Sequence, residues 1–561
     1  MSKKYKAKVG NQKEDSKVSK PKEKKAPFSV NDMNNKVLWG LTLVLTVVYF
    51  IASTFSDGFY MHDEPMFYMY AKDLIKNPAE GLLGFQKIGY TMFLVLPAMF
   101  GFTFVKFVSS LLSAVTVLYA YKILKKLGGK NSFLIFFILG LQPLWFMLAF
   151  RDFSEYLVAF LLVMTLWNHL NKKYLFAALL LSYAALTRME YHVMLGLYFM
   201  ILVAKKQWIP ALATGALTVL HNIVGFVITE DPLYLVNKVI EYGGHNNDAY
   251  PKRGFDYYIL MSNIVYGSVS IVLFFNYLAV SILKKKKPNL MLLVPVVFIF
   301  LLYCVFNHET WGIGVGGGNL RYVLPVAPLM SILCVLSIDE ILAYSKRYLA
   351  LIILAPIILL IGVYQTFDHN FMSLMDGMVN GEYYEDKVVK DWMPLILALI
   401  TTAMIALPFK KKHFLIGIPV VTIFLAITSV RTFNLNPEDK TMQKAGKWYA
   451  RYIDKNKSNP NALFNEDSRI ACSHILFYHF TDRTTNDFKK KPIIDFTKED
   501  TDSMEVGDLV VWESHYGYRP KLRPTSQTYD YYDKDPRFEK IQYYQSKDNR
   551  FLIAFFRKVS M

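Results

Sequence analysis

Long apolar runs recur along the chain from Val37 to Arg431, and many of them are close to 20 residues long. A helix of about 20 apolar residues spans the hydrocarbon core of a bilayer, which is about 30 Å thick. Of the 561 residues 53% are hydrophobic, which is more than the cores of a soluble chain of this length would bury. The pattern therefore predicts an all-α polytopic membrane protein.

The runs predict about thirteen transmembrane helices, at residues 37–56, 104–122, 132–150, 155–170, 174–189, 191–204, 208–228, 258–283, 289–306, 321–342, 348–366, 391–408 and 414–431. Basic clusters fall in alternate loops, which is the positive-inside pattern of a chain whose N-terminal segment is cytoplasmic. The apolar stretch Ile88–Phe102 would reverse every later loop if it crossed the membrane. We therefore predict that this stretch is re-entrant or interfacial.

Soluble segments flank the predicted membrane domain at residues 37–431. Residues 1–36 are expected to form a disordered, basic cytoplasmic tail, because ten lysines and only three acids fall within residues 1–27. This tail and the short loops carry most of the net charge of +18, so nucleic acid is not an expected partner. Residues 432–561 are expected to form a small α/β soluble domain outside the membrane.

The C-terminal segment opens with a helix signal and continues with short strand-like runs. Asn436 and Pro437 suit the cap and the first turn of a helix. The run Trp512–Tyr516 fits either a sugar-binding loop or a strand that ends in ordinary aromatic packing. Strands are expected at residues 462–464, 470–478, 492–496, 508–512 and 551–556.

Two adjacent carboxylates follow the first predicted span, in an outer loop at residues 57–103. Asp63 and Glu64 lie between His62 and Pro65, and proline is a favourable first residue of a helix. A helix N-terminus stabilises carboxylates in the ionised form. The pair therefore suits either a base and charge stabiliser or a helix cap with solvated acids.

Further charged residues are predicted at the outer ends of spans. Arg151, Asp152 and Glu155 share one tight loop, and Arg188 and Glu190 share another. Ionisable side chains near the membrane are costly unless they pair or face a cavity. These residues are candidates for a substrate pocket, with interfacial anchors or internal ion pairs as the alternative.

Two cations on the same side suit a phosphate group. Arg321 follows His308, Glu309 and a glycine-rich loop, whose backbone amides can approach a ligand closely. Lys87 lies just before the re-entrant stretch. We count His308 and Glu309, with His62, as further pocket candidates. The alternatives are a flexible loop that ends in an interfacial arginine and a lysine on an amphipathic segment.

The histidines do not predict a metal site. His62, His245 and His308 lack a tight metal-binding spacing, and the sequence has no His-Glu-x-x-His motif. We therefore expect no metal and no other cofactor. The alternative is a divalent ion held by Asp63 and Glu64.

These features resemble the GT-C superfamily of membrane glycosyltransferases, which take a sugar from a polyprenyl phosphate carrier. The motif His62-Asp63-Glu64 is similar to the acidic motifs of lipid-phosphate-mannose-dependent mannosyltransferases, protein O-mannosyltransferases and aminoarabinose transferases. Residues 320–325 resemble their arginine-tyrosine-proline entry into a late span. The resemblance covers roughly residues 37–340 and implies a GT-C type fold with a catalytic first outer loop.

The resemblance also implies an inverting single displacement of the sugar from polyprenyl phosphate. Asp63 would deprotonate the acceptor hydroxyl, and Glu64 would orient Asp63 or exchange roles with it. The expected activity is that of a hexosyltransferase for mannose or a similar hexose, and it requires no metal. The cations expected at the leaving phosphate are Lys87, Arg321, Arg151 and Arg188.

The expected partners are the bilayer, a polyprenyl-phosphate-linked sugar and an acceptor that is a glycan, a lipid or a protein. The expected location is a bacterial inner membrane, with the endoplasmic reticulum membrane as the alternative. Two other classes stay open, namely a transporter or lipid flippase, and a lipid-linked glycan polymerase or ligase. Paired halves with broken helices would favour a transporter, and an outer arginine and histidine loop would favour a polymerase.

Overall fold

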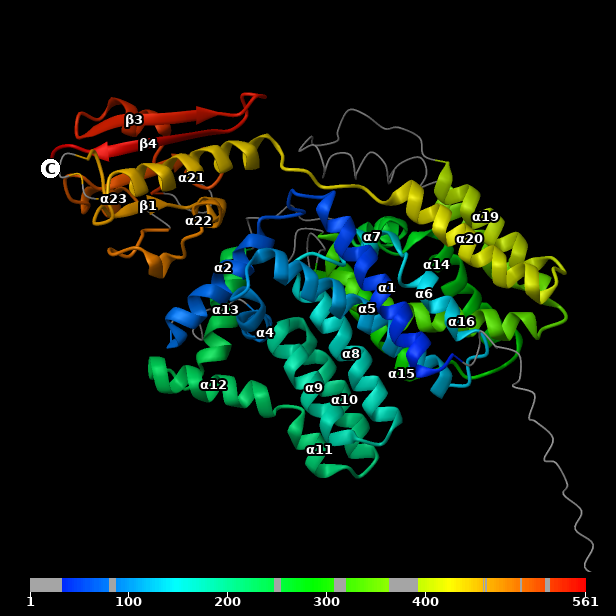
Figure 1. Ribbon diagram of the computed structural model, residues 1–561. Helices are drawn as coiled ribbons and strands as arrows, with labels where there is room; N and C mark the ends of the chain where they lie inside the picture. The colour runs from blue at the N-terminus through cyan, green and yellow to red at the C-terminus, as the bar shows by residue number, and fades with distance from the viewer. Residues whose placement is uncertain are drawn as a thin grey trace, which may run out of the picture.

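The structure is a computed structural model that describes residues 33–79, 87–246, 254–306, 319–362, 392–457, 459, 462–494, 497–519 and 525–561. A bundle of helices ends with α20 (Lys411–Ser429), and a smaller α/β unit begins with α21 (Pro437–Lys455), as Figure 1 shows. Residues 1–32 of the predicted basic tail lie outside the described residues.

Five of the described helices are long and apolar enough to cross a membrane. They are α1 (Asn35–Thr54), α5 (Phe102–Lys126), α14 (Tyr257–Leu283), η3 with α16 (Leu320–Val326 and Ala327–Leu342) and α20. A sixth is obtained if α12 (Ala216–Thr229) and the start of α13 (Tyr234–Asn246), which meet at 91°, form one broken span. The predicted number of about thirteen full spans is therefore not confirmed within the described ranges.

Shorter helices fill the rest of the bundle. The helix α4 has 11 residues and is about 16 Å long, too short to cross a bilayer, as expected for a re-entrant or interfacial stretch. The bounds of these helices are α2 Asp63–Lys76, α4 Ile88–Ala98, η1 Ser132–Leu134, α6 Ile135–Ile138, α7 Pro143–Leu148, α8 Ser154–Leu170, α9 Tyr174–Thr187, η2 Met189–Tyr191, α10 His192–Ala204, α11 Trp208–Ala213, α15 Leu290–Phe306, η4 Arg347–Ala350, α17 Leu351–Leu360 and α19 Met393–Ala406.

The expected span at residues 132–150 is broken into η1, α6 and α7. Pro143 begins α7 and has no amide hydrogen with which to continue a helix from α6. The Tyr49 hydroxyl donates to the carbonyl oxygen of Gly140 (2.7 Å), which satisfies a backbone acceptor at the break. Non-helical backbone is tolerated at membrane depth where protein surrounds it in this way.

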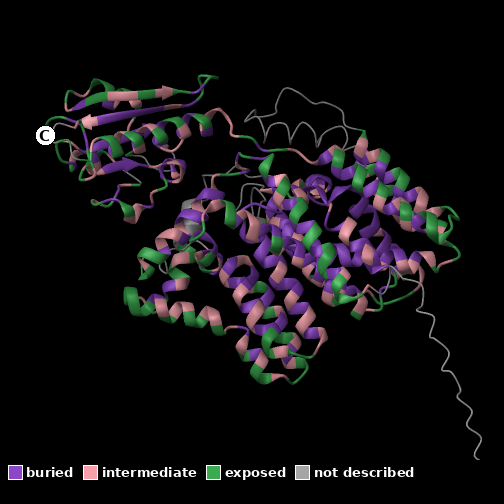
Figure 2. Ribbon diagram, viewed as in Figure 1, coloured by how far each residue is buried: buried purple, intermediate pink, exposed green. Residues whose placement is uncertain are grey.

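The helices α14 and α16 are the most buried of the long helices, and Figure 2 shows buried residues along this part of the bundle. In the most apolar stretch of each helix, 78% of the residues are buried in α14 and 83% in η3 with α16, against 33% in α1 and in α20. The outer helices expose large apolar side chains, including Leu43, Ile51, Ile352, Val420 and Ile427. Such an apolar surface is stable in lipid rather than in water, so the chain is a multi-pass membrane protein.

The C-terminal unit is a four-stranded sheet that packs against α21. The strand order is β1-β2-β4-β3; β1 and β2 are parallel, and the other two pairs are antiparallel. Asn436 and Asp439 form a capping box at the start of α21, and Trp448 of this helix contacts Phe555 (ring centroids 4.8 Å apart). The elements are β1 Ile470–Cys472, α22 Ile475–Thr481, η6 Thr485–Asp487, α23 Lys498–Asp502, β2 Leu509–Glu513, α24 Tyr529–Lys534, β3 Phe538–Gln545 and β4 Leu552–Lys558.

Several expected strands differ from the sheet. The run at 470–478 is a strand only to Cys472, because His474 accepts the amide hydrogen of Leu476 and begins α22. Residues 462–464 are not a strand, and Ile493 makes only a single bridge to the sheet. The strand β3 was not predicted, because its half-exposed sequence mixes polar and apolar residues without a clear alternation.

The first outer loop contacts both the C-terminal unit and the segment that leads into it from α20. The amide of Gly58 donates to the carbonyl oxygen of Phe433 (2.7 Å). A Cβ atom at position 58 would lie 2.2 Å from the backbone of Asn434, so this close approach requires glycine. The helix α2 packs against α22, where Lys72 pairs with Asp482 (2.7 Å). The C-terminal unit therefore supports the loop that carries Asp63.

Candidate active site

Charged side chains from four distant segments form one buried array next to α2. The guanidinium of Arg321 pairs with Asp63 and with Glu155 (Nε to Oε1, 3.2 Å). Arg188 pairs with the same Glu155 and with Glu190. Cations and carboxylates thus alternate, which offsets the cost of placing them away from water. We refer to these five residues as the ion-pair array.

Asp63 is the most exposed member of the ion-pair array. It is the first residue of α2, and its side chain is 35% exposed, whereas that of Arg321 is 1% exposed. Desolvation alone would raise the pKa of Asp63, but Arg321 and Lys87 hold this pKa below its ordinary value. Asp63 is therefore ionised at neutral pH and open to a ligand.

Glu64, next in the chain, is buried in a separate ion pair. Its two carboxylate oxygens accept hydrogen bonds from Nη1 of Arg151 (3.0 and 3.1 Å), and Oε1 also accepts from the amide of Tyr60 (2.6 Å). Arg151 also donates to the carbonyl oxygen of Gly58 (2.9 Å) and to the hydroxyl of Ser56 (2.7 Å). Both charged side chains are fully enclosed, so this pair holds the shape of the first outer loop.

Arg321 has hydrogen-bonding capacity left over. It lies in the short 3-10 helix η3, which begins where the Asn319 side chain accepts the amide hydrogen of Arg321. Among the described residues, Nη1 of Arg321 has no hydrogen-bond partner although it is buried. A buried guanidinium donor without a partner is costly, and it suits an anionic ligand that is brought to the site.

Lys87 adds a second cation beside the array. It caps α4 in a left-handed conformation (φ 53°), and its ammonium lies 4.6 Å from the ring centre of Phe67. Burial lowers the pKa of Lys87 to about 8, opposed by Glu155 and reinforced by Arg188. In the part of the chain that the structure describes, this ammonium makes no ion pair with a carboxylate. Its charge is available to a bound anion at neutral pH.

The remaining pocket candidates divide into three groups. Asp152 accepts a hydrogen bond from the hydroxyl of Tyr90 (2.5 Å), and burial raises its pKa well above the ordinary value. Glu190 accepts from the hydroxyl of Tyr303, within the ion-pair array. His308 and Glu309 lie outside the described residues.

The fold matches that of solved structures. No family model matches the chain, and no curated protein matches it. The crystal structure of ArnT from Cupriavidus metallidurans bound to undecaprenyl phosphate aligns with a TM-score of 0.55 at 10% identity, over 93% of this chain and 98% of that one. The apo state of the same protein aligns over the same shares, with a TM-score of 0.52 at 13% identity. The chain has the fold of ArnT. This agrees with the fold expected from the resemblance in the first outer loop.

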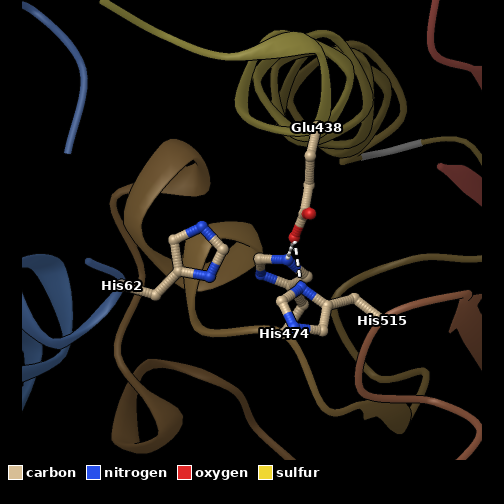
Figure 3. Close-up of side chains that lie close together, drawn as sticks. All are labelled: His62, Glu438, His474 and His515. Atoms are coloured by element: carbon tan, nitrogen blue, oxygen red, sulfur yellow. Dashed lines mark hydrogen bonds and ion pairs between the residues drawn. The ribbon is translucent and has the colours of Figure 1, made fainter. Parts of the chain in front are cut away.

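A second cluster joins the first outer loop to the C-terminal unit. His62, Glu438, His474 and His515 each bring a side-chain nitrogen or oxygen within 4.8 Å of the others, as Figure 3 shows. Oε1 of Glu438 is 2.9 Å from Nε2 of His474 and 2.7 Å from Nδ1 of His515. We refer to these four residues as the histidine cluster.

The histidine cluster was not predicted from the sequence. Its members are far apart in the chain, and no local spacing brings them together. One feature that three of them share is their position at the start of a helix: His62 and His474 precede helices, and Glu438 lies in the first turn of another. Within the run Trp512–Tyr516, the indole of Trp512 donates to a backbone carbonyl, while His515 joins the cluster.

Proposed function

We propose that the protein is a membrane glycosyltransferase whose donor is a sugar linked to polyprenyl phosphate. One observation carries this proposal: the ionised, partly exposed Asp63 is paired with Arg321, whose Nη1 lacks a partner among the described residues, and lies beside Lys87. A candidate base and two cationic side chains that can bind phosphate therefore share one site. The undecaprenyl phosphate in the ArnT crystal structure supports a lipid phosphate as the leaving group.

The reaction assigned to this site is a single displacement. Asp63 takes the proton of the acceptor hydroxyl while the hydroxyl oxygen forms a bond to the anomeric carbon of the sugar. The bond from this carbon to the phosphate oxygen breaks, and its electron pair leaves with polyprenyl phosphate. Arg321 and Lys87 bind the phosphate oxygens on which negative charge develops. Attack opposite the leaving group inverts the anomeric configuration.

The other charged residues are assigned positioning roles. Arg188 is paired with Glu155 and Glu190, and its guanidinium lies 4.5 Å from the ring centre of Tyr322. It therefore orients Glu155, which in turn holds Arg321. Arg151 is assigned to the loop rather than to the phosphate, because Glu64 occupies it. Both oxygens of Glu64 are hydrogen-bonded to Arg151, so we assign Glu64 a positioning role and do not assign it as a metal ligand.

The sugar, the acceptor and the membrane are further parts of the proposal. We take a hexose such as mannose as the donor sugar, on the resemblance of His62-Asp63-Glu64 to mannosyltransferase motifs. The acceptor is a hydroxyl group of a glycan, a lipid or a protein. We place the reaction on the extracytoplasmic face of a bacterial inner membrane, which the alternating basic loops support.

The proposal is tested by donor turnover in nanodiscs. Purified protein is incubated with a panel of polyprenyl phosphate sugars and a crude membrane extract that supplies acceptors, and the release of polyprenyl phosphate is measured. Asp63→Asn is expected to lower the rate at least about 100-fold, because a general base contributes roughly 10² to 10⁴. Asp454→Asn, at a side chain of α21 that is 66% exposed, is the matched control and is expected to retain the wild-type rate.

Two results would contradict the proposal. If Asp63→Asn releases polyprenyl phosphate at the wild-type rate while remaining folded, Asp63 is not the base. If the wild type consumes no donor, the transferase assignment fails. Lipid translocation by the protein in liposomes would then support a flippase instead.

A further inference from the structure

We propose that the histidine cluster binds one divalent transition metal ion, of the class of Zn²⁺, and that this ion ties the first outer loop to the C-terminal unit. The proposal goes beyond the transfer reaction and does not depend on it. The expectation of no metal rested on spacing along the chain. Folding brings together His62, Glu438, His474 and His515, which that spacing could not reveal.

The donor set fits a borderline metal. Three imidazoles and one carboxylate are ligands that zinc accepts, with bonds of about 2.0–2.2 Å in a tetrahedral arrangement. Ligand atoms around such an ion lie roughly 3.4 Å apart. In the cluster all four lie within 4.8 Å of one another, and Glu438 is already within 3 Å of two nitrogens. Small side-chain adjustments therefore bring all four ligands to one ion.

Outer contacts fix the ligands in place. His62 hydrogen-bonds through Nε2 to Asp439 (3.2 Å), so Nδ1 is the nitrogen that would bind an ion. An ion at Nδ1 would displace the hydroxyl of Tyr516, which lies 3.0 Å from it. Glu513 accepts the amide hydrogens of His515 (2.7 Å) and Tyr516 (2.9 Å), which fixes the turn that carries His515. Metal-binding histidines commonly have a carboxylate at the ring nitrogen that does not bind the ion, and Asp439 has this position at His62.

The surroundings favour a cation and allow one to enter. The carboxylates of Asp439 and Glu513 add negative charge to that of Glu438. The side chain of His515 is 38% exposed and that of Glu438 is 21% exposed, whereas His474 is fully enclosed. An ion therefore reaches the cluster from solvent on the His515 side and is held against His474.

Metal binding has a local signature at His474. The amide of Leu476 donates to Nδ1 of His474 (3.2 Å), so Nε2 carries the proton that Glu438 accepts. A metal at Nε2 requires this proton to move to Nδ1. The amide of Leu476 then loses its acceptor. Hydrogen exchange at Leu476 is thus expected to become faster when the ion binds, while exchange in the first outer loop becomes slower.

The test measures bound zinc rather than sugar transfer. Full-length protein is purified with a tag that contains no histidine, stripped with a chelator and equilibrated with Zn²⁺ in competition with a coloured chelator. We expect one tightly bound zinc per chain. His515→Ala, at the exposed edge of the cluster, is expected to weaken binding by more than the roughly 10- to 100-fold that loss of an outer-shell partner costs. His413→Ala, at an exposed histidine of α20, is the control.

The possible results separate clearly. Loss of zinc in His515→Ala and in Glu438→Gln, with zinc retained in His413→Ala, supports the site. Absence of stoichiometric zinc in the wild type overturns it, and so does zinc retained by His515→Ala at the wild-type affinity. If Glu438→Gln does not fold, the exposed His515 still provides the test. Because no donor sugar is used, failure of the transferase proposal leaves this result unaffected.

Discussion

His62 and Asp63 are neighbours in the chain, but their side chains contact different parts of the molecule. His62 hydrogen-bonds to Asp439 of the C-terminal unit (3.2 Å), whereas Asp63 pairs with Arg321 of the helical bundle. The first turn of α2 therefore connects the two parts at the residue proposed as the base. A displacement of the C-terminal unit is expected to alter the position of Asp63.

Arg321→Lys is expected to lower kcat/KM for the donor about 100- to 1000-fold, as loss of one transition-state donor does elsewhere. Lysine is a single point of charge and cannot pair with Asp63 and Glu155 while presenting a further donor to phosphate. Inhibition by free polyprenyl phosphate should weaken in parallel. Arg451→Lys, at an exposed position of α21, is the control. Unchanged inhibition by the lipid phosphate would remove Arg321 from the phosphate site.

Lys87 is expected to set the alkaline limit of activity. Its pKa is lowered to about 8, so the free enzyme loses this positive charge as the pH rises through that value. We therefore expect kcat/KM for the donor to fall above about pH 8. Lys87→Arg keeps its charge throughout this range, so its profile should remain flat to higher pH. If kcat/KM of Lys87→Arg falls at the same pH as that of the wild type, the titrating group is not Lys87.

Glu64→Gln is expected to lower the free energy of unfolding by on the order of 3 kcal/mol, because it leaves the buried charge of Arg151 without a counter-charge. Denaturant unfolding in detergent measures this change. Asp63→Asn, at a partly exposed side chain, should cost much less stability. A Glu64→Gln variant that is as stable as the wild type but as inactive as Asp63→Asn would place Glu64 in the reaction itself.

Gly58→Ala is expected to loosen the contact between the first outer loop and the C-terminal unit. Its Cβ atom would lie 2.2 Å from the backbone of Asn434, and backbone atoms can yield only if one segment moves. Hydrogen exchange in α2 should become faster and donor turnover slower. Gly40→Ala is the matched control, because no atom lies within 4 Å of its added Cβ. Equal exchange in the two variants would mean that the contact does not hold α2.

The sequence predicted the long helices well and the broken ones badly. The expected span 37–56 corresponds to Asn35–Thr54, and 258–283 to Tyr257–Leu283, because each run is predominantly apolar. The second helix is kinked at Gly267, which was not predicted from the sequence. The run 132–150 is equally apolar but is not one helix. Hydrophobicity reports burial, whereas continuity of a helix also depends on residues such as Pro143.

Residues of the ion-pair array could be singled out from the sequence as candidates. Charged residues near a membrane must be paired or functional, and this rule indicated Glu155, Arg188 and Glu190. Asp63 was indicated by the acidic pair at a helix N-terminus, and Arg321 by its place after the glycine-rich loop. The different surroundings of Asp63 and Glu64 were not accessible, because they depend on Arg151, 87 residues further along the chain. The histidine cluster likewise depends on tertiary contacts between segments that no local pattern relates.

The contact between Gly58 and Phe433 also bears on how the protein is made. The first outer loop is among the earliest segments to leave the ribosome, whereas its supporting partners follow some 375 residues later. At about 5–20 residues per second, that delay is on the order of tens of seconds. Asp63 therefore lies in a loop that has no support from the Phe433 segment until some 375 further residues have been synthesised. The contact that supports the residue proposed as the base can therefore form only after the segment around Phe433 has been synthesised.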